Sequence, residues 1–258
     1  MNRIKEVRIQ GARRIALESL RFLENLADQR GFGPEFEEAC ERLISARPTA
    51  VVLFNCLEEL KRVRTREKLR ELISRLESSP EKIAGFSGEV GRNLSILTHC
   101  HSTEAIALIK AVEPEVVYAT ETRPLYQGVK TAEELSESGI ETVLITDSAS
   151  GAVIRDVDVA IFGCDAVRRE GVVNKVGTLP MAALARAFGK RVIFAGTELK
   201  LDRREVFTLE ERDPSEVHPG IPGVKVRNPA FDVTPWRFVS GFVTDEGYYP
   251  GDSLRNRI

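Results

Sequence analysis

The sequence predicts an α/β protein, with an N-terminal helical domain over residues 1–90 and a doubly wound, Rossmann-like domain with a mainly parallel sheet over residues 91–258. Up to about residue 85, apolar residues recur at steps of three and four, which is the spacing of one buried helix face. From about residue 93, short apolar runs alternate with helical segments, as in buried parallel strands joined by crossover helices. The 258 residues, 42% of them hydrophobic, can bury a large core in one domain or in two.

Four helices are expected in the helical domain, since four apolar stripes are separated by residues that form turns. The stripes cover residues 9–27, 36–44, 49–63 and 69–76. Gly31-Phe32-Gly33-Pro34 separates the first two, because glycine and proline interrupt helices. Ser79 and Pro80 are expected to end the fourth helix, with Ser79 as the N-cap of a new segment.

Five buried strands are expected in the second domain, each a short run of mostly β-branched and other apolar residues. They cover residues 94–98, 116–120, 142–146, 159–162 and 192–195. Helices are expected over residues 102–111, 131–138 and 177–188, the second with a Thr131…Glu134 capping box. A last apolar run, from Phe238 to Val243, is expected to form an edge strand.

A basic run between residues 61 and 70 has two interpretations. Its sequence is Lys-Arg-Val-Arg-Thr-Arg-Glu-Lys-Leu-Arg. It is either the solvated connection between two helices or a surface that binds an anion or a partner. The first is favoured, because charged runs between helices usually face water.

Charge and cysteine spacing exclude several classes of function. The formal net charge is −2, which argues against a nucleic-acid coat, so no direct nucleic-acid partner is expected. No apolar run reaches the roughly 18 to 20 residues that cross a bilayer, and the first residues lack a signal-peptide core. A cytoplasmic location without a membrane partner is therefore expected. The four cysteines form no Cys-x-x-Cys pair, so a zinc ribbon is not expected.

Chemistry is expected where the parallel strands end, because ligands of doubly wound sheets bind beyond the carboxyl ends. Cys100 follows the first strand and precedes a helix, whose dipole and free amides favour a thiolate. His99 and His101 flank it and would favour the thiolate further if charged. The alternatives are a metal site with these histidines, or a buried thiol that only packs. Adjacent side chains on a strand point to opposite faces, which argues against the metal.

Asp165 follows the fourth strand, where apolar flanks would keep a carboxyl protonated, as a general acid requires. The alternative for Asp165 is an ordinary helix cap. Arg123 and Lys175 are candidate anion contacts, with an ordinary surface charge as the alternative. Asn174-Lys175-Val176-Gly177-Thr178 is expected to open a helix whose free amides favour phosphate. Neither the dinucleotide nor the P-loop glycine fingerprint occurs.

Five segments in this order resemble one superfamily, which contains aldose-phosphate isomerases and the alpha, beta and delta regulatory subunits of translation initiation factor two-B. They are Leu97-Thr98-His99-Cys100-His101-Ser102, Thr122-Arg123-Pro124 with Gln127-Gly128, Gly163-Cys164-Asp165-Ala166-Val167, Asn174-Lys175-Val176-Gly177-Thr178 and residues 228–235, Asn-Pro-Ala-Phe-Asp-Val-Thr-Pro. The resemblance covers nearly the whole chain. The isomerases of the superfamily act on ribose-1,5-bisphosphate or on methylthioribose-1-phosphate.

The resemblance implies an aldose–ketose isomerase that converts ribose-1,5-bisphosphate to ribulose-1,5-bisphosphate, with Cys100 as the base and Asp165 as the acid. Retention of both residues favours an enzyme over a non-catalytic regulatory subunit, whose partner would be initiation factor two. The Cys-His-Ser sequence and the compact length favour ribose-1,5-bisphosphate isomerase over the third possibility, methylthioribose-1-phosphate isomerase.

The resemblance also implies how the phosphorylated pentose is held, without a metal or another cofactor. The residues that would bind it are Gly11, Ala12, Arg13, Arg47, Ser102, Asn174, Lys175 and Lys200. Arg123 is added from its position after the second strand. Members of the superfamily pair through the C-terminal domain, so residues 228–235 are expected at the subunit interface of a homodimer or a hexamer.

Overall fold

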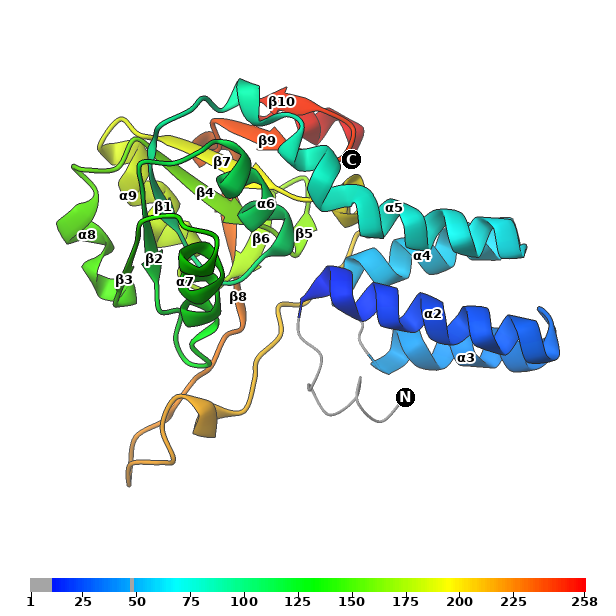
Figure 1. Cartoon of the computed structure of the whole chain (residues 1–258). Coiled ribbons are helices and arrows are strands. Elements are labelled where there is room, and N and C mark those ends of the chain that lie inside the picture. The colour runs from blue at the N-terminus through cyan, green and yellow to red at the C-terminus, as the bar shows by residue number, and fades with distance from the viewer. Residues whose placement is uncertain (1–10, 47–48) are drawn as a thin grey trace.

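The computed structural model describes residues 11–46 and 49–258, which form a bundle of helices beside an α/β domain (Figure 1). The bundle helices are α2 (Ala12–Arg30), α3 (Pro34–Ala46), α4 (Val51–Arg62) and α5 (Arg66–Ala84). They bury a leucine-rich core of their own, which also takes in Leu199 from the α/β domain. No helix within the described ranges is long and apolar enough to cross a bilayer.

The α/β domain is built on a seven-stranded sheet in the order β10-β9-β7-β4-β1-β2-β3. Its strands are β1 (Ser95–Thr98), β2 (Val116–Thr120), β3 (Thr142–Ile145), β4 (Val159–Gly163), β7 (Arg191–Ala195), β9 (Gly241–Val243) and β10 (Tyr248–Pro250). All neighbours pair in parallel except β10, which is antiparallel to β9. The strand order reverses between β1 and β4, so a crevice is expected beyond the carboxyl ends of these two strands.

Helices cover both faces of this sheet. They are α6 (Thr103–Ala111), α7 (Gln127–Glu137), α8 (Ser150–Val153) and α9 (Thr178–Ala187). Ile106 of α6 packs on a layer that includes Ile161 of β4, whereas Met181 of α9 packs with the neighbouring Phe162. Because successive strand residues face opposite sides, α6 and α9 lie on opposite faces of the sheet.

A second, antiparallel sheet of three short strands was not expected from the sequence. It has the order β5-β6-β8, with β5 at Ala166–Val167, β6 at Gly171–Lys175 and β8 at Phe231–Pro235. The prediction that residues 174–178 open a helix is therefore wrong at its start, because Asn174 and Lys175 lie on β6. Two- and five-residue strands carry too little periodicity to be distinguished from a loop.

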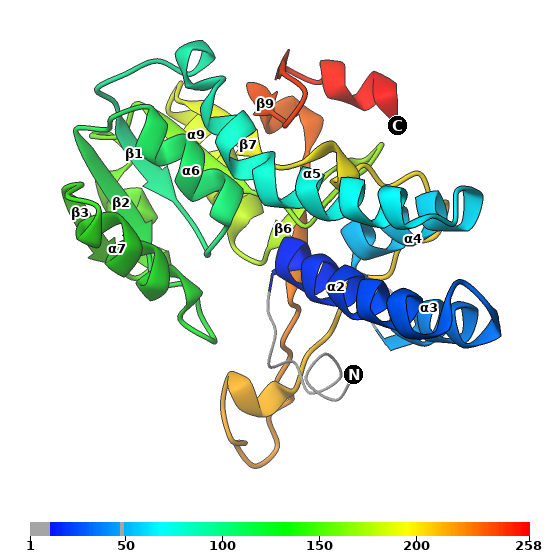
Figure 2. The same cartoon turned by 45° about the vertical axis from the view of Figure 1, so that its right-hand side comes forward.

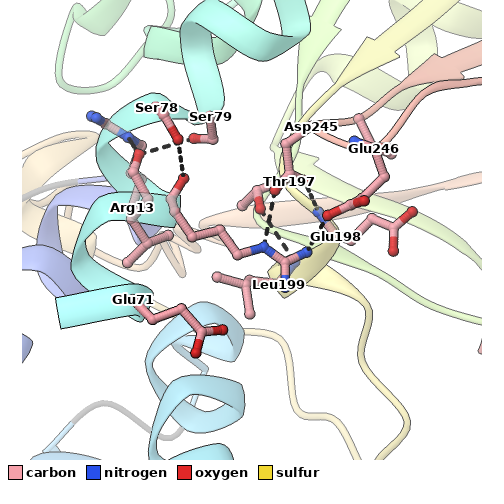
Figure 3. Close-up of polar contacts among 12 residues, drawn as sticks. Arg13, Glu71, Ser78, Ser79, Thr197, Glu198, Leu199, Asp245 and Glu246 are labelled. Atoms are coloured by element: carbon pink, nitrogen blue, oxygen red, sulfur yellow. Dashed lines mark hydrogen bonds and ion pairs between the residues drawn. The ribbon is translucent and has the colours of Figure 1, made fainter. Parts of the chain in front are cut away.

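The predicted break at Ser79-Pro80 is also wrong, because α5 continues through Pro80 to Ala84. Proline has no N–H, so the carbonyl of Leu76 loses its usual helical partner. Instead it accepts hydrogen bonds from Arg13 Nε at 2.6 Å and Ser79 Oγ at 3.0 Å (Figure 3). These two donors make an unbroken helix possible, and Ser79 lies buried inside it rather than at a cap.

Two other boundaries differ from the prediction. Helix α7 begins at Gln127, after a left-handed backbone at Tyr126 with φ 55°, so Thr131 lies within the helix and not at its cap. The run from Phe238 to Val243 does not form the edge strand, because β9 pairs with β7 on one side and β10 on the other.

Carboxylates surround most of the basic run at residues 61–70, in agreement with the solvated interpretation. Its acidic partners are Glu24, Asp28, Glu37, Glu58, Glu59 and Glu71. Most of these pairs are half-exposed, so each is expected to contribute at most about 1 kcal/mol. The run therefore connects α4 and α5, ties α5 to α2, and ties the connection itself to α3 through Arg64.

Helix α5 belongs to both parts of the molecule. Leu69, Leu72 and Leu76 lie in the bundle core, whereas Ile83 packs in the α/β core with Val90. The division of the chain near residue 90 remains a prediction. Helix α5 ends before it, at Ala84, with its last turn already packed in the α/β core.

Candidate functional site

The two strands beside the reversal of strand order each end at a candidate catalytic residue. Cys100 follows β1, Asp165 follows β4, and β1 pairs directly with β4. The charge of Asp165 raises the pKa of the Cys100 thiol, and the charge of Lys175 lowers the pKa of both groups. The fold therefore brings together three residues that the sequence places far apart.

The backbone of Cys100 is held in a rare conformation by two neighbouring loops. Its φ is 70°, a left-handed value that residues other than glycine adopt rarely. Its N–H donates to Thr122 Oγ1 at 2.8 Å, and its carbonyl accepts from Thr131 Oγ1 at 2.7 Å. These threonines fix where the thiol lies, and sequence reasoning gave neither of them this role.

The loop after β2 is itself fixed by Asp147, which follows β3. The N–H groups of Thr122 and Arg123 donate to the Asp147 carboxylate at 2.8 and 2.7 Å. Gly128, in the first turn of α7, allows this helix to approach the end of β2, since a Cβ there would lie 1.7 Å from the carbonyl oxygen of Thr120. The Thr122-Arg123-Pro124 and Gln127-Gly128 segments thus build one support for Cys100.

The surroundings of Cys100 favour the thiol. Burial raises its pKa to about 11, although Lys175 opposes the rise. Burial also lowers the pKa of His99 and of His101, so both flanking rings are neutral at pH 7. Desolvation of the thiol therefore outweighs the effect expected from the helix end, and the condition set for the histidines, that they be charged, is not met at pH 7.

His99 is committed to hydrogen bonds within the chain. Its Nδ1 lies 2.6 Å from Thr120 Oγ1, and its Nε2 lies 2.9 Å from the carbonyl oxygen of Val176. Because a carbonyl only accepts, Nε2 carries the proton. Across residues 11–46 and 49–258, no three His, Cys, Asp or Glu side chains gather as metal ligands do.

The β5–β6 hairpin fixes Asp165. Its N–H donates to the carbonyl of Val173 at 2.8 Å, so Asp165 lies across from the strand that carries Asn174 and Lys175. Burial raises the pKa of its carboxyl, and the ammonium groups of Lys200 and Lys175 oppose the rise. The direction is the one expected for a general acid. The helix-cap alternative does not apply, because strand β5 follows Asp165.

Lys200 lies on the short helix η3 (Glu198–Lys200), which follows β7, and its charge is paired with Glu104. The two atoms Lys200 Nζ and Glu104 Oε2 are 3.2 Å apart, and both side chains are 3% exposed. Burial works against the charge on Lys200, but Glu104, Cys164 and Asp165 outweigh it and raise its pKa.

Sequence reasoning missed Glu104, because a glutamate in the first turn of a helix is commonplace. Only its burial shows that it belongs to the site. Ser102, the N-cap of α6, donates to Glu104 Oε2 at 3.3 Å. A Cβ at Gly163 would lie 2.3 Å from Ser102 Cβ, so the glycine allows β4 to approach the start of α6.

Asn174 and Lys175 are both buried on β6. Asn174 Nδ2 donates to Thr178 Oγ1 at 2.9 Å, and Lys175 Nζ lies 5.3 Å from the ring centre of Phe231. Two of the amides at the start of α9 that were expected to favour phosphate are already occupied. The N–H groups of Gly177 and Leu179 donate to the Asp232 carboxylate at 2.7 and 3.1 Å, so that part of the prediction is wrong.

The remaining expected contacts lie further out. Arg123 donates to the carbonyl oxygens of Pro124 and Val217 and to Tyr126 Oη, each at 3.1 Å, and so braces the long loop at residues 202–230. That loop extends away from both domains (Figure 1).

Gly11, Ala12 and Arg13 lie at the start of α2, which faces the α/β domain near β6 in both views (Figure 2). Arg13 is engaged with the carbonyls of Leu76 and Glu77 on α5. Arg47 lies outside the described residues.

A partly buried thiol, a carboxyl with a raised pKa and two buried lysines gather around the carboxyl ends of β1 and β4. This arrangement defines an α/β protein suited to acid–base chemistry on a small anionic ligand. The chain belongs to the initiation factor 2 subunit family, whose profile matches residues 8–251. The expected superfamily and fold class are confirmed.

Relatives and solved structures cover almost the whole chain. A ribose 1,5-bisphosphate isomerase of Archaeoglobus fulgidus is 36% identical over 96% of this chain and 88% of its own length. A methylthioribose-1-phosphate isomerase of Geotalea uraniireducens is 35% identical over 89% of this chain and 78% of its own. The solved structure of the Pyrococcus horikoshii OT3 translation initiation factor eIF-2B superimposes with a TM-score of 0.83, at 28% identity, covering 96% of this chain and 94% of that one.

Proposed function

We propose that the protein is an aldose–ketose isomerase that converts ribose-1,5-bisphosphate to ribulose-1,5-bisphosphate. The observation that carries the proposal is the meeting of Cys100 and Asp165 where β1 and β4 end, within the field of Lys175. Relatives named ribose 1,5-bisphosphate isomerase support it, including those of Archaeoglobus fulgidus at 36% identity and Methanocaldococcus jannaschii at 35%.

In the proposed reaction the furanose ring opens and a proton moves from carbon two to carbon one. Asp165, as the neutral acid, donates to the ring oxygen while the bond between carbon one and that oxygen breaks. Cys100, as the thiolate, removes the proton from carbon two, which leaves an enol. Return of a proton to carbon one, assisted by Asp165, and loss of the hydroxyl proton on carbon two give the ketone. Atoms balance, since carbon two and its hydroxyl each lose one proton while carbon one and the ring oxygen each gain one.

The pKa shifts determine which protonation state reacts. Between the pKa of Asp165 and that of Cys100, the principal form pairs a carboxylate with a thiol, whereas the reactive form pairs a carboxylic acid with a thiolate. The two forms hold the same number of protons, so the reactive one is a constant minor fraction across this pH range. The pH profile is expected to be bell-shaped, with its alkaline limb set by Cys100 near 11.

Lysines supply the charge that the substrate needs. Lys175 and Lys200 are buried beside the two catalytic groups, where a phosphate would receive charge-assisted hydrogen bonds. We propose Ser102 and Asn174 as neighbouring contacts to the sugar. The second phosphate is assigned to Gly11, Ala12 and Arg13 at the start of α2 and to Arg47, with Arg123 as a peripheral contact.

One observation favours a second candidate, a non-catalytic regulatory subunit that binds initiation factor two. The solved Pyrococcus horikoshii OT3 structure named for eIF-2B matches over 94% of its length. For either function we propose a cytoplasmic homodimer or hexamer, with residues 228–235 at the interface.

A turnover assay separates the candidates. Purified protein is incubated with ribose-1,5-bisphosphate or with methylthioribose-1-phosphate, and the new carbon-two carbonyl is followed by ¹³C NMR. Cys100→Ser and Asp165→Asn are each expected to reduce turnover by about two to four orders of magnitude, whereas Cys40→Ser in the bundle retains it. Near-native turnover in both site variants would rule out the assigned roles. Absence of turnover on either sugar, together with capture of purified initiation factor two, would favour the regulatory subunit.

A further inference from the structure

We propose that Asn55 of α4 and Arg75 of α5 are positioning residues for Lys200, so that the helical bundle sets where this lysine lies in the site. The inference rests on the proposed function, because it gives Lys200 a role beside the catalytic pair. Neither residue is among those that we propose to contact the substrate.

Asn55 holds the backbone on both sides of Lys200. Its Nδ2 donates to the carbonyl oxygens of Leu199 and Leu201, both at 2.8 Å. These are the residues immediately before and after Lys200, so one amide group fixes the peptide units that orient the lysine. The side chain of Leu199 is buried in the bundle core, which adds an apolar contact at the same point.

Arg75 is linked through Asp245 to Glu198, at the start of the short helix η3 that contains Lys200. Arg75 Nε donates to Asp245 Oδ2 at 3.1 Å, and Asp245 Oδ1 accepts the N–H of Glu198 at 2.8 Å (Figure 3). The Asp245 side chain is fully buried, so Arg75 is the cation that balances its charge. Removal of Arg75 would leave that carboxylate without a counter-charge, which is strongly destabilising for a buried group.

The far end of Lys200 is held from the α/β side, where its ammonium group meets Glu104 of α6. The backbone of the turn is therefore attached to the bundle, while the charged end is attached to the sheet domain. A cleft of about 440 Å³ runs along this junction and is lined by both Asn55 and Arg75. Among the described residues, only a few hydrogen bonds beside this cleft join the bundle to residues 198–201 of the α/β domain. Loss of one of them is therefore expected to let residues 198–201 shift.

The test compares two variants with matched controls. Asn55→Ala and Arg75→Ala break the attachment. Asn25→Ala removes an amide-to-carbonyl bond within α2, and Arg21→Ala removes an ion pair to Glu77 on α5 away from the turn. A small displacement of a charged group is expected to reduce kcat about tenfold or more in the first pair, with less than a twofold change in the controls.

Two further readouts exclude a merely structural effect. Because Lys200 lowers the pKa of Asp165, its displacement should move the limb of the pH–rate profile that reports Asp165 to higher pH. Amide hydrogen exchange in residues 197–201 should also accelerate in both variants and remain unchanged in both controls. Asn55→Asp and Arg75→Lys replace the alanine variants if those do not fold. Arg75→Lys, which retains the charge, is expected to recover part of the activity.

The outcomes are distinct. If the wild-type protein does not isomerise either sugar phosphate, the proposed function fails, whatever the exchange data show. If it does isomerise, and the variants match their controls in kcat, pH profile and exchange, Asn55 and Arg75 do not position Lys200.

Discussion

Lys200 Nζ lies 3.2 Å from Glu104 Oε2, and this ion pair is almost completely buried. Each charge needs the other, since an unpaired charge in a protein interior costs several kcal/mol. Glu104 Oε1 has no hydrogen-bond partner among the described residues, so the carboxylate is only half satisfied. A phosphate that binds Lys200 would compete with Glu104, which makes Glu104 a residue that tunes how strongly the site holds an anion.

Glu104→Gln is expected to lower the free energy of unfolding by about 3 kcal/mol, because it leaves Lys200 charged and unpaired. Urea denaturation at pH 7 measures the change. Glu134→Gln is the matched control, since it breaks the exposed pair with Lys110 and should cost less than about 1 kcal/mol. The double variant Glu104→Gln/Lys200→Met should be more stable than Glu104→Gln alone. Equal losses in Glu104→Gln and in the control would contradict the importance of this pair.

Alkylation of Cys100 by iodoacetamide is expected to be slow at pH 8 and to increase with an apparent pKa of about 11, since burial raises the pKa of the thiol. Lys175→Gln should slow alkylation at each pH below that value, because the lysine lowers this pKa. Mass spectrometry of the Cys100 peptide after timed reaction gives the rate. Lys190→Gln, in the connection between α9 and β7, should leave the rate unchanged. An apparent pKa at or below the ordinary thiol value of about 8.5 would contradict this account.

Gly128→Ala is expected to destabilise the protein by about 1 to 3 kcal/mol, the usual cost of overpacking, and to reduce turnover. Its new Cβ would lie 1.7 Å from the carbonyl oxygen of Thr120, so the loop that holds Cys100 through Thr122 must shift. Gly151→Ala serves as the control, because no atom lies within 4 Å of its added Cβ. Thermal unfolding and turnover of the two variants provide the comparison. Similar behaviour of both would show that the loop tolerates the methyl group.

Asp232 is expected to make stability fall as the pH rises from about 4 to 6. Burial raises the pKa of its carboxyl to about 6, although the amides of Gly177 and Leu179 oppose this. In that window the folded chain holds a proton that the unfolded chain has released, so increasing pH favours unfolding.

Urea denaturation at pH 4, 5, 6 and 7 checks the sign. The difference in unfolding free energy between wild type and Asp232→Asn should decrease between pH 4 and 6 and then level off. Asp213→Asn provides the opposite case at the acid end, near and below pH 4, because a backbone hydrogen bond lowers the pKa of Asp213. A wild-type advantage that grows with pH at Asp232 would mean that the amides outweigh burial.

The strands that precede Cys100 and Asp165 could be predicted because buried parallel strands are continuous apolar runs. Residues 94–98 and 159–162 are such runs, and the sheet confirms both as β1 and β4. The meeting of Cys100 with Asp165 then follows from topology alone. What the sequence did not predict depends on partners far along the chain. The helix continues through Pro80 because the carbonyl of Leu76, which Pro80 cannot serve as a donor, accepts a hydrogen bond from Arg13. Arg13 lies 63 residues before Leu76 in the chain.

The site also contains residues whose role depends on burial rather than on type. Glu104 and Asp232 are ordinary carboxylates in sequence. Only the packing of α6 and β8 places Glu104 against the buried charge of Lys200 and Asp232 against the amides at the start of α9. The five residues of β6 gave no strand signal, because the run ends in the polar Asn174 and Lys175 and the strand is defined by its pairing with β8. Arg13 was expected at the substrate, but its contacts with α5 could not be foreseen without the fold.

Because α5 continues through Pro80, one rigid helix joins the bundle to the sheet domain. Its 19 residues extend about 28 Å at 1.5 Å per residue, with one end rooted beside Ile83 in the sheet domain and the other carrying the bundle. A rotation of only about 10° at that root would sweep the far tip through several ångströms at this length. A ligand that displaces the C-terminal end of α5 would thus move the entire bundle, because α5 is continuous from Arg66 to Ala84.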